Sequence, residues 1–404
     1  MILLFDLDDT LLGNVANDFV PSYLKAISTN FDAIINPKQF LYGLRNGTLK
    51  MLANLDPAKT LEEVFDENFY PSLGIPKEKI IDQINNFYVQ VYPALKNNTI
   101  VIPEAFRLLQ SLIEDGHKVI IATNPLFPQI ATKHRLEWAG LNSNQLDFQL
   151  ITTFENLHFA KPNLEYYAEI LAQNGWMNET AAMIGNDLND DIQPATELGL
   201  PTFHVNLESN FESNEEITHS HGTLDQVKAW VDQIAKINYT FECATPASVL
   251  AILRSTPATL STFSKSAIDA AWQFRPNEHE WNNTEIICHL RDLDRDINFN
   301  RINSVLYSNN PFISAINTDA WAEQRNYHQE DRYQSLDQFI SVRKKLITLL
   351  SGLDASDWFK PARHSIFGPT NLFELMKFIA QHDRAHIQQI VDNQAKWKVK
   401  QSIL

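Results

Sequence analysis

The sequence predicts an α/β protein with a parallel sheet in its first half, a helical insertion within that half, and an all-helical bundle in its second half. Short apolar runs of strand length alternate with helical periodicity up to about residue 237, which is typical of a parallel sheet covered by helices. An insertion of helical character, residues 14–99, interrupts this alternation after the first run. From Thr245 onward the alternation stops, and four long helical segments follow without a strand-like run.

Length and composition limit the class of protein. A chain of 404 residues exceeds what one hydrophobic core usually serves, so we expect two or three domains. The formal net charge of −16 argues against a nucleic-acid partner, and no segment approaches the roughly 20 apolar residues of a membrane span. Two cysteines are too few for a disulfide framework, so the sequence predicts a cytoplasmic protein.

The first apolar run, Met1–Phe5, is followed by Asp6 and Asp8. This pattern predicts a buried strand that brings two carboxylates to its C-terminal end, where open α/β sheets bind ligands. Side chains two positions apart in a strand lie on the same face, so both carboxylates can serve one reacting centre. An edge strand with a polar turn is the alternative reading of an isolated Asp-x-Asp pattern.

Four more apolar runs predict strands, amphipathic segments between them predict helices, and polar side chains follow the strand ends. Because parallel strands bring their carboxyl ends to one edge, we expect these polar side chains to lie together. The predicted strands are 118–123, 147–152, 181–185 and 201–205, the helices are 103–114, 129–139, 163–173 and 224–237, and the polar residues are Thr123, Asn124, Lys161, Asp187 and Asp191.

These side chains suit the hydrolysis of a phosphate ester. Converging carboxylates repel one another unless a hard cation lies between them, and Mg²⁺ bound by carboxylates, waters and a substrate phosphate is the usual solution. A carboxylate beside that ion can attack phosphorus and form an aspartyl phosphate. Thr123 and the neighbouring backbone N–H groups, including that of Asn124, can hold the phosphoryl oxygens, while Lys161 neutralises their charge. Taken singly, each residue is more often structural, as a turn residue, a solvated charge or a helix cap.

Together these residues resemble the haloacid dehalogenase (HAD) superfamily over about residues 1–235. The four motifs are Asp6-Leu7-Asp8-Asp9-Thr10, then Thr123, Lys161 and Asp187-x-x-x-Asp191. The resemblance implies a HAD-like Rossmannoid core with a C1-type helical cap. It also implies that Asp6 is the nucleophile, that Asp8 is the general acid/base, and that Mg²⁺ binds Asp6, the Asp8 carbonyl and Asp187, with Asp191 assisting.

Two details of the motifs bear on this interpretation. Gly185-Asn186-Asp187 stands where the family has a plain Gly-Asp, so Asn186 is an alternative to Asp187, and Asp190 is a further candidate for the same role. Superfamily members that displace halide lack the second Asp of the first motif, because a halide needs no proton when it leaves. Asp8 is present, and the resemblance therefore implies a phosphatase rather than a dehalogenase.

The second half contains three histidines at apolar positions of predicted helices. His289 shares a stripe with Leu290 and Ile297, and His382 and His386 form an i, i+4 pair that can bind one metal from one helix face. A lone His289 would more often be a core residue. The four predicted helices span 246–274, 282–307, 335–353 and 371–396, which is sufficient for a four-helix bundle.

The bundle resembles the DinB-like family over about residues 245–400, through Trp281-x-x-x-Glu285-x-x-x-His289 and His382-Asp383-Arg384-Ala385-His386. The resemblance implies that His289, His382 and His386 bind a divalent metal, with water completing the shell, and Zn²⁺ or Ni²⁺ is expected. Known activities of that family include metal-dependent transfer or isomerisation of small thiols.

The complete prediction is a fusion of two parts. Residues 1–13 and 100–237 form the HAD-like α/β core, 14–99 the cap, 238–245 a linker and 246–400 the bundle. The leading function is Mg²⁺-dependent hydrolysis of a small phosphorylated metabolite, a phosphomonoester. Two alternatives concern the bundle, which is either the main catalyst, a thiol transferase or isomerase, or a non-catalytic assembly or sensing module. We expect neither nucleic acid nor membrane as a partner, and a homodimer through the bundle.

Overall fold

The computed structural model describes residues 1–15, 19–142, 144–177, 179–206, 217–237 and 239–403. The chain forms two compact units, one of residues 1–170 and 178–242 and the other of residues 171–177 and 243–404. Among the described residues, no helix is both long enough and apolar enough to cross a membrane. Residues 16–18 of the predicted cap and residue 238 of the predicted linker lie outside the described residues.

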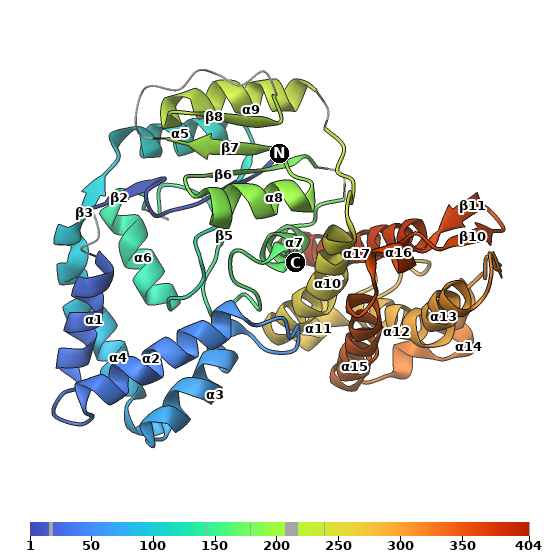
Figure 1. The fold of residues 1–404 in the computed structure, drawn as a ribbon, viewed down its shortest axis with the longest axis horizontal. Helices are drawn as coiled ribbons and strands as arrows, with labels where there is room; N and C mark the ends of the chain where they lie inside the picture. The colour runs from blue at the N-terminus through green and yellow to red at the C-terminus, as the bar shows by residue number, and fades with distance from the viewer. Residues whose placement is uncertain (16–18, 143, 178, 207–216, 238, 404) are drawn as a thin grey trace. The chain divides into compact units, whose positions relative to one another are not determined.

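A six-stranded parallel sheet forms the centre of the first unit (Figure 1). Its strand order is β5-β4-β1-β6-β7-β8, so β1 lies between two neighbours. All four residues of β1 are buried, because a strand covered on both faces needs apolar side chains on both. The strands are β1 (Ile2–Phe5), β4 (Lys118–Ile121), β5 (Phe148–Ile151), β6 (Ala181–Gly185), β7 (Thr202–Val205) and β8 (His219–Gly222).

Helices cover both faces of this sheet, which confirms the predicted α/β class. In Figure 1, α5 and α9 lie on one face and α8 lies on the other. Strand β8 is absent from the prediction, because its sequence His-Ser-His-Gly has no apolar run and it pairs with β7 alone at the sheet edge. The helices of the core are α5 (Pro103–Glu114), α6 (Gln129–Trp138), α7 (Leu164–Gln173), α8 (Gln193–Leu198) and α9 (Val227–Lys236).

The insertion after β1 is helical between two short strands that pair antiparallel. Aromatic side chains join it to the core, where the Tyr92 ring stacks on Trp138 of α6 with centroids 5.2 Å apart. Thr60 and Glu63 form a capping box that fixes the start of the third helix. The elements are β2 (Leu12–Asn14), α1 (Phe19–Asn30), α2 (Pro37–Leu52), α3 (Leu61–Leu73), α4 (Ile81–Asn86) and β3 (Thr99–Val101).

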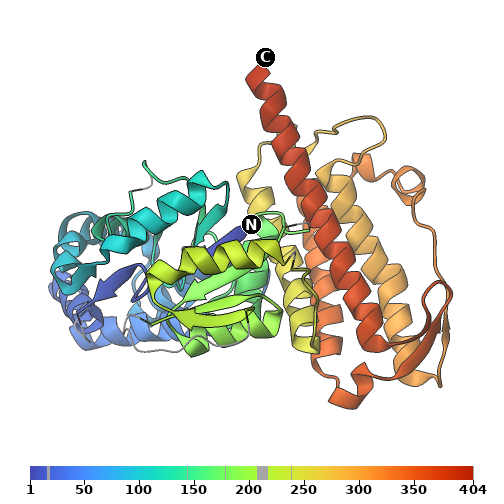
Figure 2. The ribbon, with the colours of Figure 1, turned by 90° about the horizontal axis from the view of Figure 1, so that it is seen from above.

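Four long helical segments form the bundle of the second unit (Figure 2). The segments α10 and α12 each pack against α15 and α17. The predicted capping box at the start of α12 is present, with Asn282 accepting from the Glu285 N–H at 3.0 Å. The helices are α10 (Pro246–Ser266), α11 (Asp269–Trp272), α12 (Asn283–Leu293), α13 (Phe299–Tyr307), α14 (Trp321–Gln324), α15 (Arg332–Ser351), α16 (Ala355–Trp358) and α17 (Leu372–Ile403).

The expectation that this half lacks strands is wrong. A three-stranded sheet in the order β11-β10-β9 lies between the long helices in sequence. It escaped the prediction because the strands carry Pro, Gly, Arg and His rather than an alternating apolar pattern. The strands are β9 (Phe312–Ile313), β10 (Pro361–His364) and β11 (Gly368–Asn371).

A buried cation of α15 joins that helix to three other helical segments of the bundle. The Arg343 guanidinium, about 1% exposed, donates to Asp294 Oδ2 at 2.6 Å and to Asp383 Oδ1 at 3.2 Å. It also donates to the Leu253 carbonyl at 3.1 Å. Each carboxylate therefore depends on Arg343 for its countercharge, because water does not reach it.

We expect Arg343→Met to destabilise the bundle by about 3–5 kcal/mol, because two buried carboxylates lose their cation. The control is Lys345→Met, which removes an exposed cation from the same helix. The measurement is the denaturant midpoint of each full-length variant, followed by a signal from the second unit. Equal midpoints for the two variants would contradict a structural role for the Arg343 network.

Candidate functional site

The first carboxylate of the predicted site is held at the end of the central strand. Asp6 follows β1 directly, and its N–H donates to the Ile184 carbonyl of β6 at 2.9 Å. Its side chain, 9% exposed, accepts from Lys161 Nζ at 2.7 Å and from Thr10 Oγ1 at 3.2 Å. Asp6 is thus fixed by backbone on one side and by two side-chain donors on the other.

Asp8 lies in a turn beyond β1, with a side chain about 40% exposed. The Leu7 carbonyl accepts from both Leu11 and Leu12 N–H groups, which turns the chain toward β2. Asp9 takes a positive φ of 58°, a conformation that Asp tolerates better than most residues. The turn therefore leaves the Asp8 side chain accessible at the strand end.

A residue that the sequence analysis missed holds Asp8. The buried Arg135 of α6 forms an ion pair with Asp8 Oδ1, and Asn14 Nδ2 donates to the same oxygen at 3.4 Å. Arg135 also donates to Asn14 Oδ1 at 3.2 Å. Its guanidinium lies 4.0 Å from the Phe19 ring centroid. No local motif marks Arg135, because only the fold brings α6 beside the first motif.

Lys161 is a buried cation that contacts two carboxylates of the site. Its ammonium, 2% exposed, donates to Asp6 Oδ1 at 2.7 Å and to Asp191 Oδ1 at 2.6 Å. Although burial opposes the charge, the carboxylates of Asp191 and Asp6 hold the pKa of Lys161 well above its ordinary value. Burial and the nearby Asp6 raise the pKa of Asp191 to about 6, against the opposing effect of Lys161.

The two aspartates of the fourth predicted motif, Asp187 and Asp191, have different surroundings. Asp191 is buried against Lys161, whereas the exposed Asp187 side chain accepts from the Asn189 and Asp190 N–H groups at 2.7 and 2.9 Å. The Asp187 side chain thus caps the π-helical turn Leu188–Ile192, and its N–H donates to Asp191 Oδ2 at 3.1 Å.

The residue before Asp187 is linked to Asp6 through Thr10. Asn186 Oδ1 accepts from Thr10 Oγ1 at 3.1 Å, and the same hydroxyl contacts Asp6. Gly185 allows Asp191 to reach back to this point, since a Cβ on Gly185 would lie 2.7 Å from the Asp191 Cβ. The structure therefore brings Asp6, Lys161, Asp191 and Asn186 together, and directs the Asp187 side chain to the helix cap instead.

Thr123 and Asn124 follow β4 as predicted. The Thr123 carbonyl accepts from Thr152 Oγ1 at 2.6 Å and from the Tyr166 hydroxyl at 2.8 Å, which ties this loop to the segment after Lys161. The buried Asn124 Oδ1 has no hydrogen-bond partner among the described residues. An unsatisfied buried amide is costly unless a ligand or water completes it.

The residues at this edge fit a hard divalent cation. Asp6, Asp191 and the amide of Asn186 present oxygen atoms, the donors that Mg²⁺ prefers. The carboxylates of Asp6 and Asp191 and the ammonium of Lys161 together carry one net negative charge. These groups are buried, so a bound cation would balance that charge.

The second candidate site lies in the bundle. His289 of α12 and His382 and His386 of α17 present ligand atoms that all lie within 4.8 Å of one another. His382 Nε2 and His386 Nε2 are 3.2 Å apart, and the buried His289 Nδ1 has no hydrogen-bond partner among the described residues. Three converging imidazoles of this kind suit a transition metal with an open position.

The environment of these histidines favours their neutral, ligating form. Burial, followed by the neighbouring imidazoles, lowers the pKa of His289 to about 3, and burial lowers that of His386 to about 4. Trp281 lies against His289 with ring centroids 4.8 Å apart. A cavity of about 220 Å³ borders His382 and is lined also by Arg301 and His364.

Comparison with known protein families gives two matches. Residues 3–205, half of the chain, match the family described as haloacid dehalogenase-like hydrolase. Residues 252–390 match the DinB superfamily.

Two curated relatives carry the same name. A glyceraldehyde 3-phosphate phosphatase of Methanocaldococcus jannaschii is 27% identical over 237 residues, 58% of this chain and 97% of the relative. A protein of that name from Methanothermobacter thermautotrophicus is 36% identical over 61 residues, 15% of this chain and 27% of the relative.

Two solved structures are also similar to parts of the chain. A HAD phosphatase from Thermococcus onnurineus is 16% identical, with a TM-score of 0.37, over 57% of this chain and 97% of that one. YfiT from Bacillus subtilis, which has an unusual four-helix bundle topology, is 18% identical, with a TM-score of 0.36, over 39% of this chain and 91% of that one.

For the histidine cluster, we expect protein purified without a histidine tag to carry, or take up, one transition metal per chain in addition to Mg²⁺. The double variant His382→Ala/His386→Ala removes two of the three ligands and should lose this metal. His328→Ala, an exposed histidine of the same unit, is the control and should retain it. Elemental analysis makes the comparison. Wild-type protein that neither carries nor binds such a metal would identify the three histidines as core residues.

Proposed function

Because the chain belongs to the haloacid dehalogenase-like hydrolases, we propose that its first unit hydrolyses a small phosphomonoester through an aspartyl phosphate. The observation that carries the proposal is the buried contact of Lys161 with both Asp6 and Asp191 at the C-terminal edge of the sheet. Two relatives named as phosphatases support the same reaction. Asp8 favours a phosphatase over a dehalogenase, since an alkoxide leaving group needs a proton and a halide does not.

The first proposed step is attack of an Asp6 carboxylate oxygen on phosphorus. A bond forms between that oxygen and phosphorus as the bond from phosphorus to the ester oxygen breaks. Asp8 donates a proton to the departing oxygen, which leaves as an alcohol. Thr10, which donates to Asp6, helps hold the attacking carboxylate.

The second proposed step regenerates the enzyme. Asp8, now ionised, takes a proton from water, and the resulting hydroxide attacks the phosphorus of the aspartyl phosphate. The bond between phosphorus and the Asp6 oxygen breaks, which releases inorganic phosphate and restores the carboxylate. Arg135 and Asn14 hold Asp8 for both transfers.

The remaining residues bind the metal ion and the phosphoryl oxygens. We assign Mg²⁺ to Asp6, the Asp8 carbonyl, Asn186 and Asp191, and we propose Asn186, the alternative that the sequence offers to Asp187, as the amide ligand. The ion, when bound, offsets the negative charge of the phosphoryl group. Lys161 would stabilise the same charge, and Thr123 and Asn124 would bind phosphoryl oxygens.

For the bundle, we propose a single transition metal, Zn²⁺ or Ni²⁺, bound by His289, His382 and His386. The convergence of three imidazoles, that of His289 buried and those of His382 and His386 partly buried, beside a cavity supports this second site. A metal-dependent thiol transferase or isomerase is one proposed role, and a non-catalytic assembly or sensing module is the other. A cytoplasmic location, the lack of nucleic-acid and membrane partners, and a homodimer through the bundle stay predictions from the sequence.

Asp6→Asn should lower phosphomonoester turnover by more than about a hundredfold, because an amide is a poor nucleophile of nearly the same shape. Asp9→Asn, a change of the same kind three residues away at an exposed position, should stay near wild type. Release of inorganic phosphate from a panel of esters is the measurement. An Asp6→Asn enzyme within tenfold of wild type would remove Asp6 as the nucleophile.

The metal assignment predicts different effects for two adjacent substitutions. Asn186→Ala should raise the Mg²⁺ concentration needed for half-maximal activity, because it removes a proposed ligand. Asp187→Ala should leave that concentration nearly unchanged and cost only about 1 kcal/mol of stability through the lost cap. Mg²⁺ titrations of both variants decide the matter. The reverse order of effects would restore Asp187 as the ligand.

A further inference from the structure

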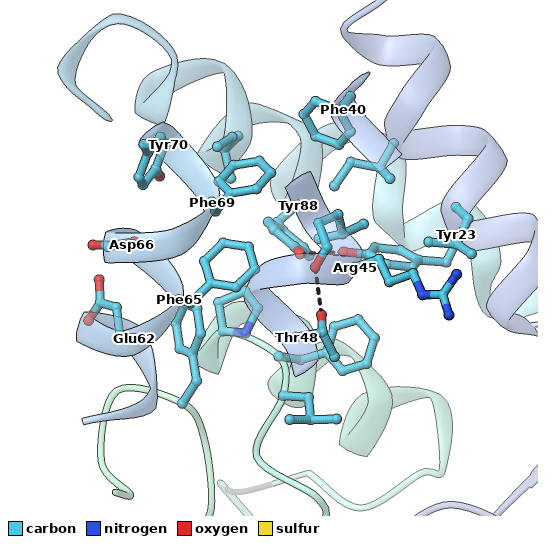
Figure 3. Close-up of a pocket in the computed structure, with 18 of the residues that line it drawn as sticks. Tyr23, Phe40, Arg45, Thr48, Glu62, Phe65, Asp66, Phe69, Tyr70 and Tyr88 are labelled. Carbon is cyan, nitrogen blue, oxygen red and sulfur yellow. Dashed lines mark hydrogen bonds between the residues drawn. The ribbon is translucent and has the colours of Figure 1, made fainter. Parts of the chain in front are cut away.

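A cavity of about 550 Å³ lies in the cap, away from the charged residues described above. It is enclosed by α1, α2, α3 and α4 and by two loops of the core. Figure 3 shows the rings of Phe40, Phe65 and Phe69 gathered around it, with Tyr23 and Tyr88 close by. The volume is within the range of about 300–1,000 Å³ that is typical of sites for organic ligands.

The polar groups of the deep wall already have partners. The hydroxyls of Tyr23 and Tyr88 are 2.9 Å apart, and Thr48 donates to the Leu44 carbonyl at 2.9 Å. These bonds use the Thr48 proton and one of the two tyrosine hydroxyl protons, so this wall offers a ligand few polar partners. A polar ligand group placed against this wall would lose its hydration without replacement, which disfavours polar occupants.

Five charged residues line the cavity, and three of them form a cluster of ion pairs at the rim. Of the other two, Arg45 is exposed and Glu155 accepts from the Gln129 N–H at 2.9 Å. Lys77 forms ion pairs with Glu62 at 3.1 Å and Asp66 at 2.5 Å, and all three side chains are partly exposed. In Figure 3, Glu62 and Asp66 point away from the centre of the cavity. The interior of the cavity is thus aromatic and aliphatic, and its charges face solvent.

The cavity shares a loop with the proposed phosphate site. Leu126, Phe127 and Pro128 line the cavity, and only Pro125 separates them from Thr123 and Asn124 in the chain. The Leu126 N–H donates to the Asn124 carbonyl at 2.8 Å, so the loop is a tight turn. Phe154, after β5, lines the same wall from the segment that leads to Lys161.

We propose that this cavity, the cap cavity, binds the leaving group of the substrate, and that this group is a sizeable apolar one, an alkyl or aryl chain. The inference rests on the proposed phosphatase function and narrows its substrate class. We therefore expect a substrate other than glyceraldehyde 3-phosphate, the compound in the name of the two relatives. The three-carbon polar group of that compound would neither fill the cavity nor match its apolar wall.

The proposal gives a quantitative expectation for a series of n-alkyl phosphates. Each methylene that enters the cap cavity should raise kcat/KM about fourfold, which is equivalent to about 0.8 kcal/mol per buried methylene. The increase should stop once the chain fills the cavity. Hexyl phosphate should therefore be hydrolysed far more efficiently than ethyl phosphate or glyceraldehyde 3-phosphate.

A filling substitution tests where the chain binds. Leu44→Trp places a larger side chain in the cavity and should lower kcat/KM for hexyl phosphate by about tenfold or more, while ethyl phosphate stays within about threefold of wild type. Ile84→Trp, from α4, should act in the same way if one variant fails to fold. Tyr42→Trp is the matched control on α2, because Tyr42 is exposed and outside the lining.

Binding of non-hydrolysable alkyl phosphonates, measured by calorimetry on the full chain, separates the two levels of the proposal. If hexyl phosphonate binds more tightly than ethyl phosphonate, and Leu44→Trp removes the difference, the result supports binding in the cap cavity. This holds even if no ester is hydrolysed, and in that case only the phosphatase function fails. Turnover of all esters with no gain from chain length, or an equal loss on both esters in Leu44→Trp, overturns the cap cavity and leaves the phosphatase function intact.

Discussion

The buried ammonium of Lys161 between Asp6 and Asp191 is the interaction on which the catalytic unit depends. The three groups come from segments separated by 155 and 30 positions, and each carboxylate would be costly to bury without the cation. Because two carboxylates face one ammonium, the cluster keeps one negative charge. That surplus makes the site a place for a divalent cation and, with the cation, for a phosphoryl group.

The parallel sheet is the physical reason these groups meet. Parallel strands end at the same edge, so the loops after β1, β4, β5 and β6 deliver their side chains to one place. Gly185 then determines the local fit, because any Cβ there would collide with Asp191. The cap follows β1 through β2 and returns through β3, and we propose that it selects the leaving group without contributing to the chemistry.

Sequence patterns predicted those features that depend on local periodicity. The central strand, β6 and α5 were all foreseen, because apolar runs and helix boundaries are local signals. The edge strand β8 was not foreseen, since backbone pairing with β7 holds a sequence without apolar character. Arg135 likewise carries no motif, and its contact with Asp8 exists only once α6 has folded.

The central claim is that Asp6 is the residue that becomes phosphorylated. Acid quenching during turnover of an alkyl phosphate, followed by peptide mass analysis, tests it most directly, because an acyl phosphate survives acid long enough to be mapped. The account predicts a phosphoryl group on the N-terminal peptide at Asp6, absent from the Asp6→Asn protein. Phosphate release with no phosphorylated peptide, or phosphorylation at another residue, would contradict it.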